Sequence, residues 1–186
     1  QMLNFYGVPS SVGAGMTDAK LPDCQAGYEN ALAVALAAPT GCNNVSESAG
    51  MLGSLMALSL ESLVIDNDML GAILRTVRGI EVNEETLSYH VMEQVVHGEG
   101  HFLRAEQTLG LMRTEYEYPA LADRRTSGEW EAAGSLDIRE QAAERVRSIL
   151  STHYPEYIDP AVDARIRERF PILLPEDVLK PGSGRW

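Results

Sequence analysis

The sequence has few cysteines, few basic residues and no long apolar run. Cys24 and Cys42 are the only cysteines in 186 residues, which excludes a disulfide framework and favours a reducing, cytoplasmic compartment. Lysine and arginine total 15 against 27 aspartates and glutamates, a net charge of −12. This balance argues against nucleic-acid binding, which needs clustered cations. No run reaches the roughly 18 apolar residues of a membrane span, and no signal peptide is visible.

What is present is typical of a globular protein. Hydrophobic residues make up 45% of the chain and charged residues 23%, which excludes a disordered protein. The length suits one domain of about 150 residues with a small appendage. Because the chain opens on Gln1 with an apolar segment already under way, we expect it to be part of a longer protein.

The first eighty residues are predicted to alternate strands and helices. Apolar segments that end at turn residues predict strands over residues 3–6 and 41–45, with a long loop over 8–20 between the first strand and the next helix. Apolar residues at helical spacing predict helices over residues 25–37, 51–65 and 69–78, with Asp23 as the first N-cap and residues 66–68 as an interruption.

The rest of the chain is predicted to be helical. Cap residues are expected at Asn83, Thr126, Asp137 and Asp159. The helices expected from these caps and from apolar spacing cover residues 84–96, 101–112 and 137–151, and a last one carries Val162, Ile166 and Phe170. This organisation predicts βα units over 1–80, a helical region over 81–180 that packs on them and a disordered tail over 181–186.

Two strands joined by a helix suggest parallel βα units, because parallel strands need a crossover connection. A two-stranded parallel sheet is not stable alone, so further strands must come from elsewhere in a larger protein or from another chain. The predicted fold class is therefore α/β, half of a TIM (β/α)8 barrel with about two of its parallel strands, followed by a mostly helical region.

Polar side chains in the loops after the two predicted strands are the best candidates for a site. In parallel sheets and barrels, function lies at the carboxyl ends of the strands. Asp18 and Lys20 follow the first predicted strand, and Asn43, Asn44 and Glu47 lie at the end of the second. The competing interpretation is that these side chains only cap and fix their loops.

Other motifs are weaker. Gly13 and Gly15 lack the third glycine of a dinucleotide fingerprint and the Lys-Ser/Thr ending of a P-loop, so close backbone approach explains them better. Residues 97–101 place two histidines around a glutamate, but the glycines and the wrong spacing favour a turn over zinc binding. The two cysteines lack CxxC spacing. No metal site is predicted.

The order and spacing of several segments resemble the trimethylamine methyltransferase (MttB) family. The residues that carry the resemblance are Phe5-Tyr6-Gly7, residues 13–20, Asp23 with residues 25–29, residues 60–66, residues 78–80, and residues 100–103 followed by Thr108, Arg113 and Pro119. The resemblance covers about residues 3–125 well and the remainder more loosely. It departs from the family pattern at Glu99, Glu106 and Gln107.

The resemblance implies a TIM-barrel enzyme that moves a methyl group from a methylated amine to the cobalt of a corrinoid protein. This chain would be the C-terminal portion of the TIM (β/α)8 barrel, followed by a mostly helical C-terminal region. The cofactor would be a corrinoid (cobalamin) carried by that cognate partner, with no metal bound directly by this chain. One branch of the family carries pyrrolysine, at a position that the resemblance places in or just before the loop over residues 7–23. No such residue stands here, which favours a member acting on quaternary amines such as glycine betaine.

Site residues follow from the resemblance in two groups. Aromatic faces attract quaternary ammonium ions, so Phe5 and Tyr6 are expected to bind the substrate. Asn43, Asn44 and Glu47 are expected to bind it as residues that line the mouth of the barrel. The residues expected to face the corrinoid are Gly13, Gly15, Asp18, Lys20 and His101. The expected partners are the corrinoid protein and a small methylated amine; a homo-oligomer stays open, and nucleic acid and membrane are not expected. The alternative is a non-catalytic, acidic helical interaction module, because the chain from Glu81 onward is helical and acidic.

Overall fold

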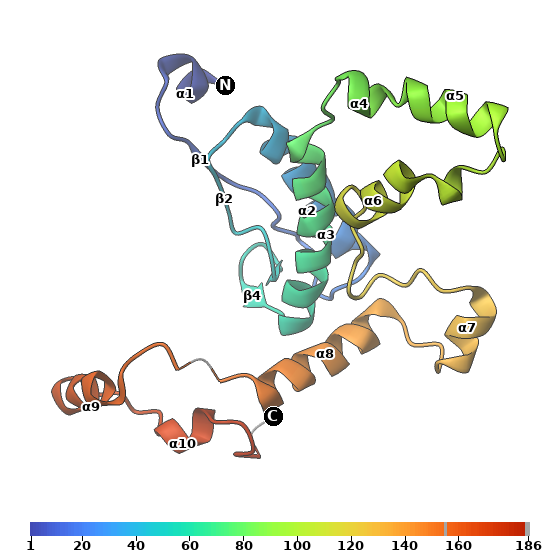
Figure 1. Cartoon of the computed structure of the whole chain (residues 1–186). Helices are drawn as coiled ribbons and strands as arrows, with labels where there is room; N and C mark the ends of the chain where they lie inside the picture. Colours follow the sequence, from blue (N-terminus) through green and yellow to red (C-terminus); the bar gives the residue numbers. More distant parts are fainter. Residues whose placement is uncertain (155, 185–186) are drawn as a thin grey trace.

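The computed structural model describes residues 1–154 and 156–184, and it shows an α/β chain in which helices dominate (Figure 1). The strands are β1 (Ser11–Gly13), β2 (Asn44–Ser46), β3 (Met51–Leu52) and β4 (Ala57–Leu58). The helices are α1 (Met2–Tyr6), α2 (Cys24–Ala37), α3 (Leu60–Arg78), α4 (Glu84–Leu87), α5 (Tyr89–His97), α6 (Glu106–Thr114), α7 (Ser127–Ala132), α8 (Ile138–Thr152), α9 (Pro160–Arg169) and α10 (Glu176–Leu179). Short 3-10 turns are η1 (Ala38–Thr40) and η2 (Phe102–Arg104).

The predicted parallel strand pair is confirmed, but its first strand lies elsewhere. β1 pairs with β2 in parallel, with Ser11 opposite Asn44 and Gly13 opposite Ser46, and α2 forms the crossover. The strand predicted over residues 3–6 is wrong, because that segment is helix α1. Three of residues 3–6 are apolar or aromatic but none is β-branched, and so short a run does not distinguish a strand from a helix.

The helix predicted over residues 51–65 is wrong in its first half. β3 and β4 form an antiparallel hairpin, and α3 then runs without a break from Leu60 to Arg78. The predicted interruption at residues 66–68 is also wrong. Asp66 and Asp68 lie inside the helix because their carboxylates bind backbone amides of distant segments instead of capping α3.

The five predicted N-caps are confirmed. Asp23 accepts hydrogen bonds from the amides of Gln25 and Ala26, and Asp159 caps α9 with Pro160 at its first position. Capping boxes are present at Asn83, Thr126 and Asp137.

Two predicted helices are shorter than expected. The helix over 84–96 is divided at Ser88, which has a positive φ of 56°. The helix over 101–112 begins only at Glu106, after η2. Residues 185–186 of the predicted tail lie outside the described residues.

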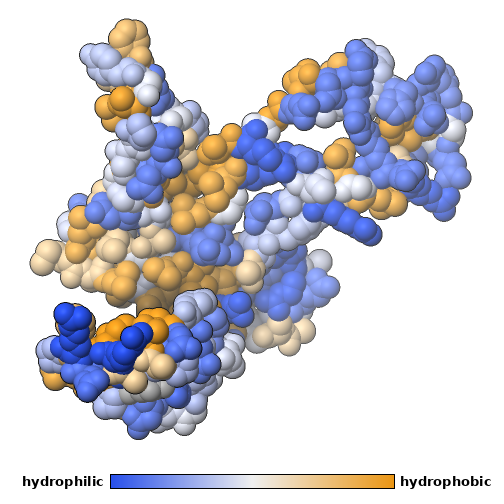
Figure 2. All heavy atoms as spheres, turned by 60° about the vertical axis from the view of Figure 1, so that its left-hand side comes forward, coloured by the Kyte–Doolittle hydropathy of each residue, from blue (hydrophilic) through white to orange (hydrophobic). Residues whose placement is uncertain are grey.

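The core is small and centres on α2 and α3. Ala14, Val34 and Ile73 form one buried cluster, and α8 packs against α3. No residue of α4, α5 or α6 is buried. The helices α4 and α5 extend away from the core, whereas α6 returns to the side of α3, where Arg78 donates to the carbonyl of Thr114 (Figure 1). Figure 2 shows hydrophobic side chains gathered on the exposed middle of the molecule. Within the described ranges, no helix is long and apolar enough to cross a membrane.

Candidate active site at the strand ends

The loops that follow β1 and β2 touch at the carboxyl ends of the strands. A Cβ atom on Gly13 would lie 2.8 Å from Oε2 of Glu47, and one on Gly15 would lie 2.7 Å from Cα of Ser48. Gly15 also has a φ of +95°, a conformation that side chains disfavour. The structure therefore brings the predicted site residues Gly13, Gly15 and Glu47 together, and two glycines permit the approach.

Glu29 of α2 holds the first loop from one side. Its Oε2 accepts hydrogen bonds from Oγ1 of Thr17 at 2.5 Å and from the amide of Asp18 at 2.9 Å. Its Oε1 accepts a bond from Nε2 of Gln25 at 3.0 Å. The hydroxyl of Thr17, and then the bonds from Gln25 and Asp18, hold the pKa of the Glu29 carboxyl below its usual value.

The hairpin of β3 and β4 holds the same loop from the other side. The amide of Ser54 donates to the carbonyl of Thr17 at 3.0 Å, and the hydroxyl of Ser54 donates to Oδ1 of Asp18. Nζ of Lys20 donates to the carbonyl of Asp18 at 2.5 Å. Asp18 and Lys20 thus lie in the predicted loop, and both have contacts that fix its shape.

The second loop is held by a buried carboxylate. Asp66 of α3 accepts a hydrogen bond from the amide of Gly50 at 2.8 Å and bonds from Nδ2 of Asn30 at 3.3 Å to each oxygen. Asn30 and Asp66 are 1% and 4% exposed. Burial raises the pKa of Asp66, and the bonds from Gly50 and Asn30 oppose that rise.

Glu47 differs from these fixed carboxylates. It is exposed and has a φ of 59°, which is a strained conformation for a residue other than glycine. Among residues 1–154 and 156–184, no hydrogen bond or ion pair involves its side chain. A strained, accessible carboxylate beside the glycines of a strand-end loop is suited to bind a cation.

The other predicted substrate-binding residues lie at the opposite, amino end of the strands. Oδ1 of Asn43 accepts from the amide of Ser10 at 3.0 Å, and Nδ2 of Asn44 donates to Oγ of Ser11 at 3.0 Å. The expectation that these asparagines lie at the carboxyl end of the second strand is wrong, because β2 runs from Asn44 to Ser46, so Asn43 precedes it and Asn44 is its first residue. Their contacts join the two strand starts.

Phe5 and Tyr6 belong to α1, which precedes β1. Their side chains are 80% and 64% exposed, and their rings meet edge to face with centroids 5.4 Å apart. They do not follow a strand, so the strand-end argument no longer supports them. Their role in binding an amine stays a prediction.

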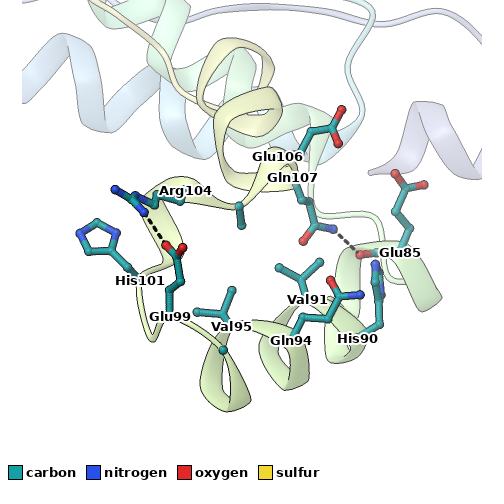
Figure 3. A pocket seen from close by; sticks show the side chains of 12 residues that line it. Glu85, His90, Val91, Gln94, Val95, Glu99, His101, Arg104, Glu106 and Gln107 are labelled. Carbon is teal, nitrogen blue, oxygen red and sulfur yellow. Dashed lines mark hydrogen bonds and ion pairs between the residues drawn. The ribbon is translucent and has the colours of Figure 1, made fainter.

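His101 lies in a separate cavity of about 630 Å³ between α5 and α6 (Figure 3). Glu99 and Arg104 form an ion pair of 2.6 Å beside it, while His90 lies at the opposite end near Glu85. The two imidazoles therefore do not converge on a common point. In the part of the chain that the structure describes, no cluster of three or more His, Cys, Asp or Glu side chains could hold a metal ion.

Sequence reasoning missed the residues that hold the two loops. Thr17, Glu29, Asn30 and Asp66 were not among the site candidates, although Asn30 and Asp66 carry a usable signal. Each is a polar residue within an apolar helical stretch, and such a residue is buried only when it is hydrogen-bonded. Glu29 carries no comparable signal because its partners are not adjacent in sequence.

The Glu29 contacts predict a pH dependence of stability. Because the folded-state pKa lies below the ordinary value of about 4.5, the contribution of this carboxylate is present above that value and is lost as pH falls through the folded-state pKa. Glutamine has no carboxylate to protonate, so we expect the free energy of unfolding of Glu29→Gln to decline less steeply as pH falls below the ordinary pKa of glutamate. Urea denaturation over a pH series measures this, with exposed Glu131→Gln as the control. If the stability of Glu29→Gln declined with falling pH as steeply as that of the unchanged protein, Glu29 would not be the source of this pH dependence.

Comparison with known proteins gives a consistent result. A family model described as trimethylamine methyltransferase (MTTB) matches residues 1–170. A glycine betaine methyltransferase of Desulfitobacterium hafniense (strain Y51) is 36% identical over 167 residues, which cover 90% of this chain and 34% of that protein. A trimethylamine methyltransferase MttB of Methanosarcina thermophila is 41% identical over 162 residues, which cover 86% of this chain and 32% of that protein. The chain spans about a third of the length of the curated relatives it matches.

Proposed function

The chain belongs to the trimethylamine methyltransferase family, and we propose that it supplies part of an active site that moves a methyl group from a methylated amine to a corrinoid. The observation that carries this proposal is the free carboxylate of Glu47 at the junction of the two strand-end loops. The methyl acceptor would be the Co(I) of a corrinoid held by a separate partner protein, and it enters the reaction as a substrate.

The chemistry needs little from the protein beyond binding and orientation. The Co(I) nucleophile attacks the methyl carbon, the carbon–nitrogen bond breaks, and its electron pair stays on nitrogen. A quaternary ammonium leaves as a neutral amine, so no general acid is required. A fixed anion near the nitrogen holds the cationic substrate in place, and Glu47 is in a position to provide it.

The other residues of the strand-end loops have supporting roles. Gly13 and Gly15 keep the loops in contact, and Asp18 and Lys20 fix the shape of the first loop. This rigid surface would lie on the side where the corrinoid approaches. His101 stays a proposed contact for the corrinoid protein, and it lines the separate cavity between α5 and α6.

The proposed architecture is part of a TIM barrel. β1 and β2 pair in parallel and are connected by helix α2, as successive strands of such a barrel are. A pair of short strands is not stable by itself, and much of the apolar surface is exposed. Both features are consistent with further strands supplied by a protein of the relatives' length.

Replacing Glu47 tests the proposal. In the protein that carries this chain at its full natural length, we expect Glu47→Gln to raise KM for a quaternary amine by on the order of tenfold, because a cation loses its countercharge. The measurement is the rate of methylcobalamin formation from cob(I)alamin, followed by absorbance. Glu131→Gln on α7 removes an equal charge from an exposed surface and should leave KM unchanged. Equal KM values for all three proteins would contradict the role of Glu47.

A second candidate is a helical interaction module. It is favoured by the absence of any buried residue in α4, α5 and α6, since such short helices are rarely stable without packing against something. This reading predicts no methyl transfer by the full-length protein with any methylated amine. The assay above therefore separates the two candidates.

A further inference from the structure

Asp66 is buried and, among the described residues, has no paired countercharge, a combination that lowers the stability of the folded state. It is a carboxylate with 4% exposure, and in the described part of the chain it has no ion-pair partner. Burial of an unpaired charge is unfavourable unless hydrogen bonds compensate for it. The compensation here comes from the amide of Gly50 and the side-chain amide of Asn30. The carboxylate therefore joins three separate segments, namely α2, α3 and the loop after β2.

Gly50 is the point at which this carboxylate holds the loop. Its amide donates to Oδ2 of Asp66 at 2.8 Å, and its carbonyl accepts from the amide of Ser59 at 3.0 Å. Gly50 is buried with a φ of +78°, and a Cβ there would lie 2.8 Å from Cδ1 of Leu58. Both backbone groups and the conformation of this residue are thus fixed.

The position of Glu47 depends on this anchor. Only two residues separate Glu47 from Gly50, and one of them, Ser48, lies against Gly15 of the first loop. The strained backbone at Glu47 needs surroundings that hold it in place. A loop fixed at Gly13 and Gly15 on one side and at Gly50 on the other leaves the Glu47 backbone little freedom, and so sets the point from which its side chain extends.

We propose that Asp66, oriented by Asn30, is a positioning residue that sets the Glu47 carboxylate against the substrate by anchoring Gly50. This inference rests on the proposed function, because it assumes that Glu47 contacts the amine. Asp66 itself touches no substrate, since its oxygens are directed to Gly50 and Asn30.

Exchanging the two polar residues tests the proposal. In Asp66→Asn, one amide oxygen can still accept from Gly50, but the new amino group then faces the amino group of Asn30. Asn30→Asp alone places two carboxylates against each other. The double variant again pairs one amide donor, now at position 66, with one carboxylate acceptor, now at position 30. We therefore expect the effects of the two substitutions to be non-additive.

The control is another aspartate of the same helix. Asp68 also accepts from backbone amides, but those belong to residues 120–122, away from the strand ends. Asp68→Asn should therefore lower stability without moving Glu47. A lower folded fraction reduces the apparent kcat and leaves KM unchanged, whereas a displaced Glu47 raises KM.

The KM for the quaternary amine is expected to differ among the three variants. In the full-length protein, Asp66→Asn should raise KM for the quaternary amine by on the order of tenfold, and the double variant should restore it to within about threefold. Asp68→Asn should leave KM unchanged. An unchanged KM in Asp66→Asn, or an equal rise in Asp68→Asn, would overturn the positioning role.

Amide hydrogen exchange separates this inference from the proposed function. Exchange at the Gly50 amide needs no substrate. It should be faster in Asp66→Asn, where the facing amino groups of Asn30 and the new asparagine displace the acceptor, and normal in the double variant. Unchanged exchange in Asp66→Asn would overturn the anchor whatever the activity. Faster exchange with an unchanged KM would support the anchor and count against Glu47 as the amine contact.

Discussion

Gly15→Ala is expected to destabilise the protein by about 3 kcal/mol. The new methyl group would lie 2.7 Å from Cα and 2.9 Å from the carbonyl oxygen of Ser48. These are backbone atoms, so they cannot move aside as the end of a flexible side chain would. The φ of +95° adds strain of its own for any residue with a Cβ. The two strand-end loops would have to separate.

Gly27→Ala is the matched control for this change. Gly27 lies within α2, and nothing lies within 4 Å of a Cβ placed there. Alanine is the better helix former, so we expect a gain of about 1 kcal/mol. Urea denaturation measures both variants, with the midpoint shifting in opposite directions. A loss at Gly15→Ala below about 1 kcal/mol would show that the loops are not held in contact.

Asp68→Ala is expected to cost about 2 to 3 kcal/mol. The Asp68 carboxylate accepts hydrogen bonds from the amides of Ala120, Leu121 and Ala122, at 3.1, 2.6 and 3.1 Å. Leu121 is only 6% exposed, so its amide would lose its partner in a place with little access to water. An unpaired buried donor carries the full cost of its desolvation.

The neighbouring Asn67 supplies the control for Asp68. Asn67 is exposed on the same helix, and Asn67→Ala should change the free energy of unfolding by less than about 0.5 kcal/mol. Thermal and urea unfolding of both variants compare the two positions. If Asp68→Ala were as stable as Asn67→Ala, the segment over residues 120–122 would not depend on this carboxylate.

Local patterns in the sequence predicted helix starts better than strands. Asp23, Asn83, Thr126, Asp137 and Asp159 are caps as predicted, because a cap depends on residues within one turn. The segments over residues 3–6 and 51–58 were assigned to the wrong element. Both are short apolar runs, whose structure depends on packing against distant segments and not on their own periodicity.

The candidate site was predictable in outline only. The strand-end rule pointed to Glu47 and the family resemblance to Gly13 and Gly15, and the structure brings these three residues together. Their role at a site stays a prediction. The strand-end rule misplaced Asn43 and Asn44, because an error of a few residues in the strand moved them from one end of the sheet to the other. The hydrogen bonds of Glu29 and Asp66 bridge 11 or more positions in sequence, so no local pattern reveals which residues they hold.

The most direct test of this account is methyl transfer by the full-length protein. Cob(I)alamin would be mixed with the protein and, in turn, with trimethylamine, glycine betaine, carnitine and proline betaine, and methylcobalamin followed by absorbance. The account predicts methylation with one quaternary amine and a higher KM for that amine in Glu47→Gln. Methylation with trimethylamine alone would contradict the expected quaternary substrate. No methylation with any donor by the folded protein would contradict the proposed enzyme and favour the interaction module.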